Sequence, residues 1–138
     1  MKKTLFHTAF PVRDINKTKA FYIDLLGCTI GRSAGNWVDI NFFGHQITAQ
    51  LNPKHVHSNI GYYNEDRVPV NHFGVILSWN DWHQLKERLI KEKVQFLIKP
   101  RTVFQGEVGE QMSMFVKDPN DYAIEFKTFK DIKKVFMR

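Results

Sequence analysis

The chain has little cysteine, because Cys28 is the single one among its 138 residues. One cysteine excludes an internal disulfide framework and suits a reducing compartment. The sequence also lacks an apolar run near the roughly 20 residues that a membrane-spanning helix needs. Its first residues lead into a strand-like segment, without the apolar core and small-residue cleavage site of a secretory signal. We therefore expect a cytoplasmic protein that does not engage a membrane.

A concentrated basic patch is missing too, although the formal net charge is +6. The lysines are spread along the chain, and the densest group lies at residues 127–138. A solvated helix face accounts for that group better than a nucleic-acid surface does. We expect no nucleic-acid partner, while the positive field would suit a small anionic substrate. The hydrophobic content of 43% is sufficient for a folded core and argues against disorder.

One order of elements, β-α-β-β-β, is predicted twice. In the first module Asp14 is placed to cap a helix over residues 15–26, and Gly27 to end it in a left-handed conformation. In the second module Asn80 is placed to cap a helix that follows the first strand. The strands are expected from alternating or apolar runs at residues 5–12, 28–32, 37–42 and 46–51, then at 70–78, 94–98, 111–117 and 121–127.

These elements define one domain made of two modules. The modules cover residues 4–51 and 69–127, a polar linker covers 52–68, and a tail covers 128–138. In the tail, one helical stripe of apolar residues predicts a docking helix. That stripe consists of Phe129, Ile132 and Phe136.

Metal-ligating residue types occupy related places in the two modules. The first strand of each module carries a histidine, His7 or His72, and the last strand carries Gln50 or Glu125. A single histidine on an apolar strand is more often a core residue than a ligand. Four polar residues at positions related by the repeat are not expected by chance, so His7, His72 and Glu125 predict a divalent metal site.

Several segments of the sequence resemble the vicinal oxygen chelate superfamily, which includes glyoxalase I, extradiol dioxygenases and bleomycin resistance proteins. They are residues 7–14, 21–27 and 118–127, while residues 42–46, 69–75 and 106–111 resemble small extradiol-type dioxygenases. The resemblance extends from about residue 5 to residue 127. It implies an α+β fold in which two βαβββ modules form a half-open, mostly antiparallel β cup with the ligands on its inner faces.

Three functions remain open within that family. An extradiol-type dioxygenase would hold Fe(II) with His7, His72 and Glu125 and act on a small aromatic diol or a related vicinal-oxygen substrate. A glyoxalase I-like lyase or isomerase would add Gln50 as a fourth ligand to Ni(II) or Zn(II), with Glu125 as the catalytic base. Mn(II) is a further candidate metal. A drug-binding resistance protein would need no metal. The first function is our leading prediction.

Candidate substrate-binding residues are less sharply indicated. Trp37 and Asn41 share a strand face that either lines the cup or meets solvent. Arg101 and Gln105 lie in a predicted loop over residues 101–110, which is either a lid for an anionic substrate or a plain surface loop. Phe115 stands in the strand before Glu125, where the ring-cleavage pattern has a tyrosine.

Two features stay open at this level. The acid–base residue is one of them, and the candidates by residue type are His45, His55 and His57. Assembly is the other, because the linker permits the two modules to pair within one chain or across two chains. The resemblance favours a homodimer.

Overall fold

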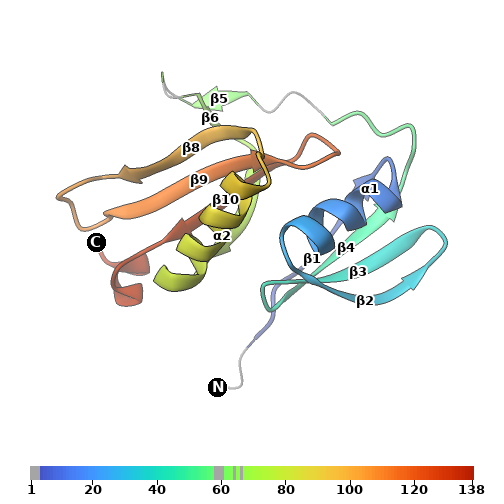
Figure 1. Ribbon diagram of the computed structural model, residues 1–138, viewed down its shortest axis with the longest axis horizontal. Coiled ribbons are helices and arrows are strands. Elements are labelled where there is room, and N and C mark those ends of the chain that lie inside the picture. The colour runs from blue at the N-terminus through green and yellow to red at the C-terminus, as the bar shows by residue number, and fades with distance from the viewer. Residues whose placement is uncertain (1–3, 58–60, 64, 66) are drawn as a thin grey trace. The chain divides into compact units, whose positions relative to one another are not determined.

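The computed structural model describes residues 4–57, 61–63, 65 and 67–138. It divides into two compact units, Met1–Ser58 and Asn59–Arg138, and each builds a four-stranded sheet of its own (Figure 1). The boundary falls in the predicted linker, of which residues 58–60, 64 and 66 lie outside the described part. Within the described ranges, no helix has the length and apolar character needed to cross a membrane.

The first unit has the predicted β-α-β-β-β order. Its sheet has the strand order β1-β4-β3-β2, with β1 parallel to β4 and the other neighbours antiparallel. The elements are β1 (His7–Val12), α1 (Ile15–Lys19), the π-helical η1 (Ala20–Leu25), β2 (Thr29–Ala34), β3 (Trp37–Phe42) and β4 (His45–Leu51). The alternating pattern predicted the bounds of β3 correctly.

Local signals fix the helical segment of the first unit. Asp14 caps α1, because its Oδ1 accepts a hydrogen bond of 2.8 Å from the Lys17 backbone N–H. Gly27, with φ of +79°, follows the end of η1 in the left-handed conformation that glycine adopts without strain. Both predictions are confirmed.

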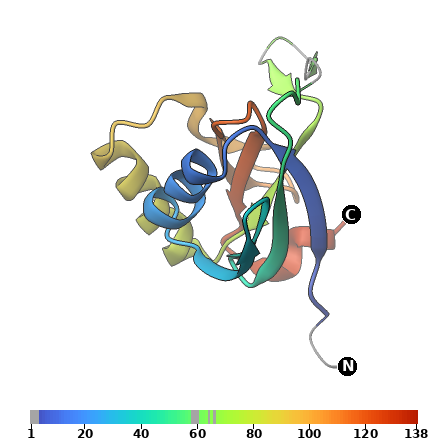
Figure 2. The same cartoon turned by 90° about the vertical axis from the view of Figure 1, so that its right-hand side faces the viewer.

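The helix of the first unit covers one face of its sheet (Figures 1 and 2). The Tyr22 ring packs edge-on against Phe10 and Phe42, at centroid distances of 6.1 and 6.0 Å. The apolar residues that alternate along the strands complete this core: Val12, Val38, Ile40, Ile47 and Ala49. The residues between them point to the opposite face, which is polar.

The second unit repeats the same topology after a small hairpin. Its main sheet has the order β7-β10-β9-β8, with β7 parallel to β10. The elements are β5 (Tyr62–Tyr63), β6 (Val68–Pro69), β7 (His72–Ile76), α2 (Trp79–Lys91), β8 (Phe96–Val103), β9 (Gln111–Lys117), β10 (Ala123–Thr128) and the 3-10 helix η2 (Ile132–Phe136). The predicted α+β fold of two βαβββ modules with mostly antiparallel sheets is confirmed.

The helix α2 begins earlier than predicted. Ser78, not Asn80, is the cap, since its Oγ accepts from the Asp81 backbone N–H at 3.2 Å. The helix is fixed to its sheet by Trp82, which is fully buried and whose Nε1–H donates to the Phe126 carbonyl at 2.8 Å. Ser78 Oγ also donates to the Asp81 carboxylate at 2.6 Å, and this local pair fixes the start of the helix.

The strand β8 runs further than predicted. It was expected to end at residue 98 because Pro100 follows, but it continues to Val103. Proline is tolerated here because β8 is an edge strand and its register with β9 is irregular between Ile98 and Arg101. The missing N–H therefore interrupts no regular ladder.

The predicted docking helix of the tail is wrong. Phe129 is buried, but Ile132 and Phe136 are 61% and 93% exposed. The segment forms the 3-10 helix η2, which has three residues per turn, and this pitch does not place residues with α-helical spacing on one stripe.

Candidate metal centre

Two of the three predicted ligands meet in the second unit. His72 on β7 and Glu125 on β10 point toward each other, with 3.2 Å between His72 Nε2 and Glu125 Oε2. Their strands are parallel neighbours, and Gly74 is the register partner of Glu125. A β-carbon added at Gly74 would lie 1.7 Å from the Glu125 carbonyl oxygen, so only glycine permits this approach. Glu125 itself is buried.

Further contacts fix the orientation of both side chains. Ser113 Oγ donates to Glu125 Oε1 at 2.7 Å, and Lys127 Nζ lies 3.4 Å from Glu125 Oε2. His72 Nδ1 is hydrogen-bonded to the Pro69 carbonyl at 2.5 Å. The Phe115 ring packs edge-on against the imidazole of His72, with 5.1 Å between the centroids. The pair is therefore preorganised.

These contacts shift the protonation equilibria of the pair. The hydrogen bond to Glu125 raises the pKa of His72 above its ordinary 6.5 and outweighs the opposing effect of burial. Burial alone would raise the pKa of Glu125. The hydrogen bonds from His72 and Ser113 and the charge of Lys127 together outweigh it, so this pKa lies below its ordinary 4.5. Both shifts thus favour the imidazolium–carboxylate form of the metal-free pair.

The chemistry of the pair fits a metal ion. The Nδ1–H of His72 donates to Pro69, so deprotonation leaves Nε2 as the ligating nitrogen. Ser113 hydrogen-bonds to Oε1 of Glu125, so Oε2 is the carboxylate oxygen that faces His72. A divalent cation in place of the shared proton would meet one imidazole nitrogen and one carboxylate oxygen, which suits Fe(II), Mn(II), Ni(II) or Zn(II).

The third predicted ligand, His7, belongs to the first unit. It opens β1, its side chain is exposed, and its register partner on β4 is Gln46. In the part of the chain that the structure describes, no three histidine, cysteine, aspartate or glutamate side chains form a group that could hold a metal ion. The complete ligand set therefore stays a prediction.

The strand register shows that Gln50 does not occupy the position in the first unit that Glu125 occupies in the second. In the second unit, His72 pairs with Ala123, two residues before Glu125. In the first unit, His7 pairs with Gln46, two residues before Thr48. Thr48, not Gln50, thus corresponds to Glu125, and the predicted correspondence is two residues out of register.

The error arose in the turns. Residues 118–122 form the connection between β9 and β10, in which Asp118 Oδ1 accepts from the backbone N–H groups of Asn120 and Tyr122. In the first unit only residues 43 and 44 separate the strands, because His45, expected in the turn, opens β4. Aligning the two turns residue by residue therefore displaced the last strands relative to each other.

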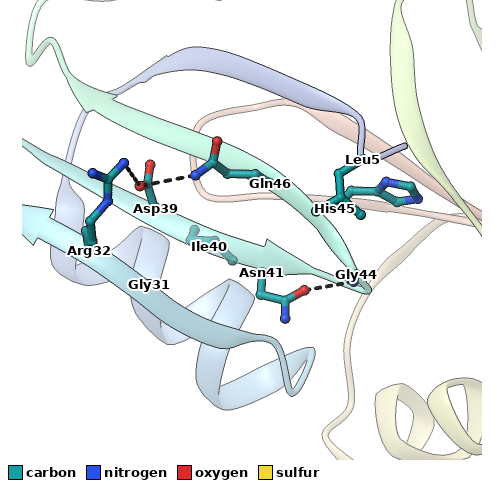
Figure 3. A pocket seen from close by; sticks show the side chains of 9 residues that line it. All are labelled: Leu5, Gly31, Arg32, Asp39, Ile40, Asn41, Gly44, His45 and Gln46. Atoms are coloured by element: carbon teal, nitrogen blue, oxygen red, sulfur yellow. Dashed lines mark hydrogen bonds and ion pairs between the residues drawn. The ribbon is translucent and has the colours of Figure 1, made fainter. Parts of the chain in front are cut away.

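The first unit holds a second buried carboxylate on its polar sheet face. Asp39 on β3 accepts from Thr48 Oγ1 at 2.6 Å and from Gln46 Nε2 at 3.3 Å, and it pairs with Arg32 at 3.5 Å. Beside it lies a cavity of about 310 Å³ (Figure 3). Its lining consists of Leu5, Gly31, Arg32, Asp39, Ile40, Asn41, Gly44, His45 and Gln46.

The predicted substrate residues fall in both units. Trp37 and Asn41 share the strand face of Asp39, and Asn41 lines the cavity. Arg101 is not in a loop but in β8, opposite Ser113, whereas Gln105 is exposed in the turn that follows. Phe115 contacts the metal-binding pair, as described above. Whether any of them binds substrate stays a prediction.

The acid–base candidates are placed as follows. His45 Nδ1 accepts from the Phe6 backbone N–H at 3.1 Å, and the rings of His55 and His57 are 6.2 Å apart. Sequence reasoning missed Ser113 and Lys127 as partners of Glu125. A signal was available for Lys127, since alternation along β10 directs it toward the face of Glu125, whereas the position of Ser113 depends on the register of β9 with β10.

Comparisons with known proteins agree with this fold. The family model of the Glyoxalase/Bleomycin resistance protein/Dioxygenase superfamily matches residues 4–126. A glyoxalase/bleomycin resistance protein/dioxygenase from Alicyclobacillus acidocaldarius has a similar structure, with a TM-score of 0.83 and 24% identity over 99% of this chain and 100% of that one. A search of the curated proteins finds no match.

Two other solved structures share the fold at lower identity. The fosfomycin resistance protein FosX from Listeria monocytogenes has a TM-score of 0.65 and 18% identity over 97% of this chain and 98% of its own. A glyoxalase/dioxygenase from Nostoc punctiforme has a TM-score of 0.68 and 13% identity over 94% of this chain and 92% of its own.

Proposed function

The chain belongs to the Glyoxalase/Bleomycin resistance protein/Dioxygenase superfamily, and we propose that it is a metal-dependent enzyme of the extradiol dioxygenase type. Its substrate would be a small aromatic diol or a related vicinal-oxygen compound. The observation that carries the proposal is the His72–Glu125 pair, whose ligating atoms lie 3.2 Å apart and whose other polar atoms are engaged by Pro69 and Ser113.

The proposed ligands are His7, His72 and Glu125. Bound Fe(II) supplies the Lewis acidity and redox chemistry that ring cleavage requires, and two histidines with one carboxylate are its characteristic ligand set. The protein's part is to hold His72 in the tautomer that presents Nε2 and to keep Glu125 ionised. Pro69 performs the first task, and Ser113 and Lys127 perform the second.

The strand register of the first unit favours a metal site with three protein ligands over a site with four. The position that corresponds to Glu125 is Thr48, whose hydroxyl is committed to Asp39 at 2.6 Å. Gln50 lies two residues further along β4 and is exposed. A neutral amide is a weak metal ligand, so the glyoxalase-like function, which needs Gln50 as fourth ligand, has less support.

Side chains on the same sheet face suit a deprotonated aromatic diol. Arg101, Ser113 and Lys127 are register partners on β8, β9 and β10, which aligns two cationic side chains beside Glu125. Coulombic attraction to these cations would favour the anionic form of the substrate. Phe115, the register partner of Glu125 on β9, adds an aromatic surface against which a ring would pack.

The test combines metal analysis with oxygen uptake. Protein is purified without oxygen, loaded with Fe(II), and supplied with catechol while dissolved oxygen is followed. We expect about one iron per chain, and loss of binding and activity in the variants His7→Ala and Glu125→Ala. His83→Ala, on α2, is the matched histidine control and should retain both. Full metal loading of a protein carrying both His7→Ala and Glu125→Ala would refute the proposed site.

The same measurements separate the alternatives. A glyoxalase-like enzyme would lose metal affinity in Gln50→Ala, would be active with Ni(II) or Zn(II), and would consume no oxygen. A metal-free drug-binding protein would bind its ligand equally well after treatment with a chelator. Fosfomycin is the probe for that arm, because a structurally similar protein is described as a fosfomycin resistance protein.

We also propose that the protein acts as a homodimer, in which the three ligands come from one chain or from two. Co-refolding the variants His7→Ala and Glu125→Ala distinguishes these cases. If each centre is shared between two chains, a mixed dimer regains one complete ligand set and part of the iron binding. If each centre forms within one chain, the mixture stays inactive. A monomer by sedimentation would refute the dimer.

A further inference from the structure

We propose that the tail of the second unit, residues 128–138, docks on an anionic membrane surface. The tail presents apolar side chains to solvent with cations on both sides of them, and both features suit the interface of an anionic bilayer. A peripheral contact of this kind needs no spanning helix, the lack of which led us to expect no membrane contact. The inference concerns the second unit alone and does not depend on the proposed metal site.

The start of the tail is fixed to the second unit. Thr128 is fully buried, and its Oγ1 donates to the Leu77 carbonyl at 2.9 Å. Phe129 beside it is 8% exposed. The Lys130 ammonium lies over the ring of Trp79 on α2, at 5.8 Å from the ring centroid. The residues that follow are therefore held at a defined place on this unit.

The next part of the tail has a regular conformation of its own. Asp131 caps the 3-10 helix η2, because its Oδ1 accepts from the Lys133 backbone N–H at 3.0 Å. The Asp131 carbonyl accepts from the Lys134 N–H at 3.0 Å, and the Lys134 carbonyl accepts from the Met137 N–H at 3.2 Å. Backbone groups that are bonded within the turn lose less free energy when they leave water for a membrane interface.

The apolar side chains of the tail beyond Phe129 are exposed. Phe136 is 93% exposed, Ile132 is 61% exposed and Met137 is 57% exposed. Large apolar side chains that lie together at such exposure mark a surface that contacts a partner or a membrane. The driving force for covering them grows with the apolar area that is removed from water.

Cations accompany these apolar side chains. The tail contains four basic residues and a single acidic residue, Asp131. All four basic residues are exposed: Lys130, Lys133, Lys134 and Arg138. The apolar stems of lysine and arginine can lie along a lipid interface while their charges meet the phosphates of the headgroups. This composition favours an anionic bilayer over a zwitterionic one.

The pitch of η2 favours a membrane over a protein groove. With three residues per turn, Ile132 and Val135 project on one side of the helix and Phe136 projects about 120° away from them. A groove of fixed shape suits apolar side chains that share one face. A fluid lipid interface accepts them on several sides. A nucleic acid would attract the cations through its phosphates but would give the apolar side chains no matching surface.

Vesicle sedimentation tests the proposal. The full-length protein is mixed with vesicles of equal parts phosphatidylserine and phosphatidylcholine, or with vesicles of phosphatidylcholine alone, and the bound protein is measured after centrifugation. We expect binding to the neutral vesicles to be at least about tenfold weaker. Binding to the anionic vesicles should also weaken as the salt concentration rises, because salt screens the lipid charge.

Two variants separate the apolar and the cationic contributions. Phe136→Ser should weaken binding to the anionic vesicles about tenfold, since its ring is the exposed apolar group that would leave water. Lys133→Gln combined with Lys134→Gln should weaken binding about 25-fold, at about fivefold for each cation. These side chains are exposed, so both variants are expected to fold.

Matched controls lie outside the tail. Val56→Ser removes an apolar side chain that is 82% exposed in the first unit. Lys54→Gln combined with Lys91→Gln removes two exposed lysines. Both controls should bind the anionic vesicles like the natural sequence, and loss of binding in either would place the contact elsewhere and overturn the proposal.

The remaining outcomes also contradict the proposal. Equal binding to both kinds of vesicle, no binding to either, or full binding by Phe136→Ser would each do so. If Phe136→Ser converts a dimer to a monomer in sedimentation, the tail is a contact between two copies of the chain. If a duplex oligonucleotide displaces the vesicles and binds Phe136→Ser as tightly as the natural sequence, the tail is a nucleic-acid surface.

Discussion

Removing one hydroxyl group tests whether Glu125 is held for metal binding. The change is Ser113→Ala, which deletes the Oγ that donates to Glu125 Oε1 at 2.7 Å and leaves the contacts of His72 and Lys127 in place. Ser113 is 3% exposed and Glu125 is 8% exposed, so water does not readily replace the lost donor. The substitution therefore isolates a single buried interaction.

The expected magnitude follows from the charge and burial of the acceptor. A hydrogen bond to a charged group contributes about 1.5–3 kcal/mol, and we expect the free energy of unfolding of the metal-free protein to fall by that amount. Groups that orient a metal ligand typically change metal affinity by about 10- to 100-fold when they are removed. Ser113→Ala should therefore weaken Fe(II) binding by a factor in that range.

The assay pairs urea unfolding with anaerobic metal titration, and the first unit supplies a matched control. Thr48→Val removes a hydroxyl that donates to another buried carboxylate, Asp39, at 2.6 Å. It should lower the free energy of unfolding by a similar amount while leaving metal affinity unchanged. The reasoning is refuted if Ser113→Ala binds metal as tightly as the natural sequence, or if Thr48→Val weakens metal binding equally.

The protonation of the metal-binding pair, the packing at Gly74 and the burial of Cys28 each give a further prediction. The His72–Glu125 pair contributes most to the stability of the metal-free protein between pH 4.5 and 6.5. The pKa of His72 is raised on folding, so its stabilising contribution is lost as the pH rises through the folded-state pKa. The pKa of Glu125 is lowered on folding, so its contribution is lost as the pH falls through the folded-state pKa. Urea midpoints across pH should show this maximum, which must vanish in His72→Asn. Gly74→Ala should lower the free energy of unfolding by at least about 1–3 kcal/mol, because the added β-carbon would clash with the backbone of Glu125. By contrast, Gly35→Ala, where no atom lies within 4 Å, should be nearly neutral in thermal melts. Burial raises the pKa of Cys28 to about 11, so iodoacetamide at pH 8 should alkylate it only after unfolding, and rapid native labelling would contradict this.

Much of the fold could be predicted because its signals are local. Alternation along β3 and the capping carboxylate of Asp14 depend on neighbours within a few residues, and both predictions were correct. The start of α2 was not, since Ser78 and Asn80 both carry side chains that can cap a helix. A local signal that the prediction overlooked distinguishes them, because the Ser78 hydroxyl and Asp81, three residues further on, hydrogen-bond to each other.

The sequence indicated which strands carry the residues of the candidate site, but it did not indicate how those strands are paired in register. Repeat-related positions indicated His72 and Glu125, and the structure brings them together. The contacts of Glu125 with Ser113 and of Asp39 with Arg32 depend on how strands are paired, and in the second case on a bulge. One extra residue in a strand or turn reverses which side chains share a face, and sequence alternation alone does not detect it.

The parallel pairing of first and last strands has a consequence for the synthesis of the chain. In each unit the sheet closes only when β4 meets β1, or β10 meets β7, so no unit can complete its hydrogen bonding before its final strand has left the ribosome. The first unit reaches that point at Leu51, before any strand of the second main sheet exists. Emerging chains would therefore fold in two stages, and a cut between the units would leave each fragment with all four strands of its sheet.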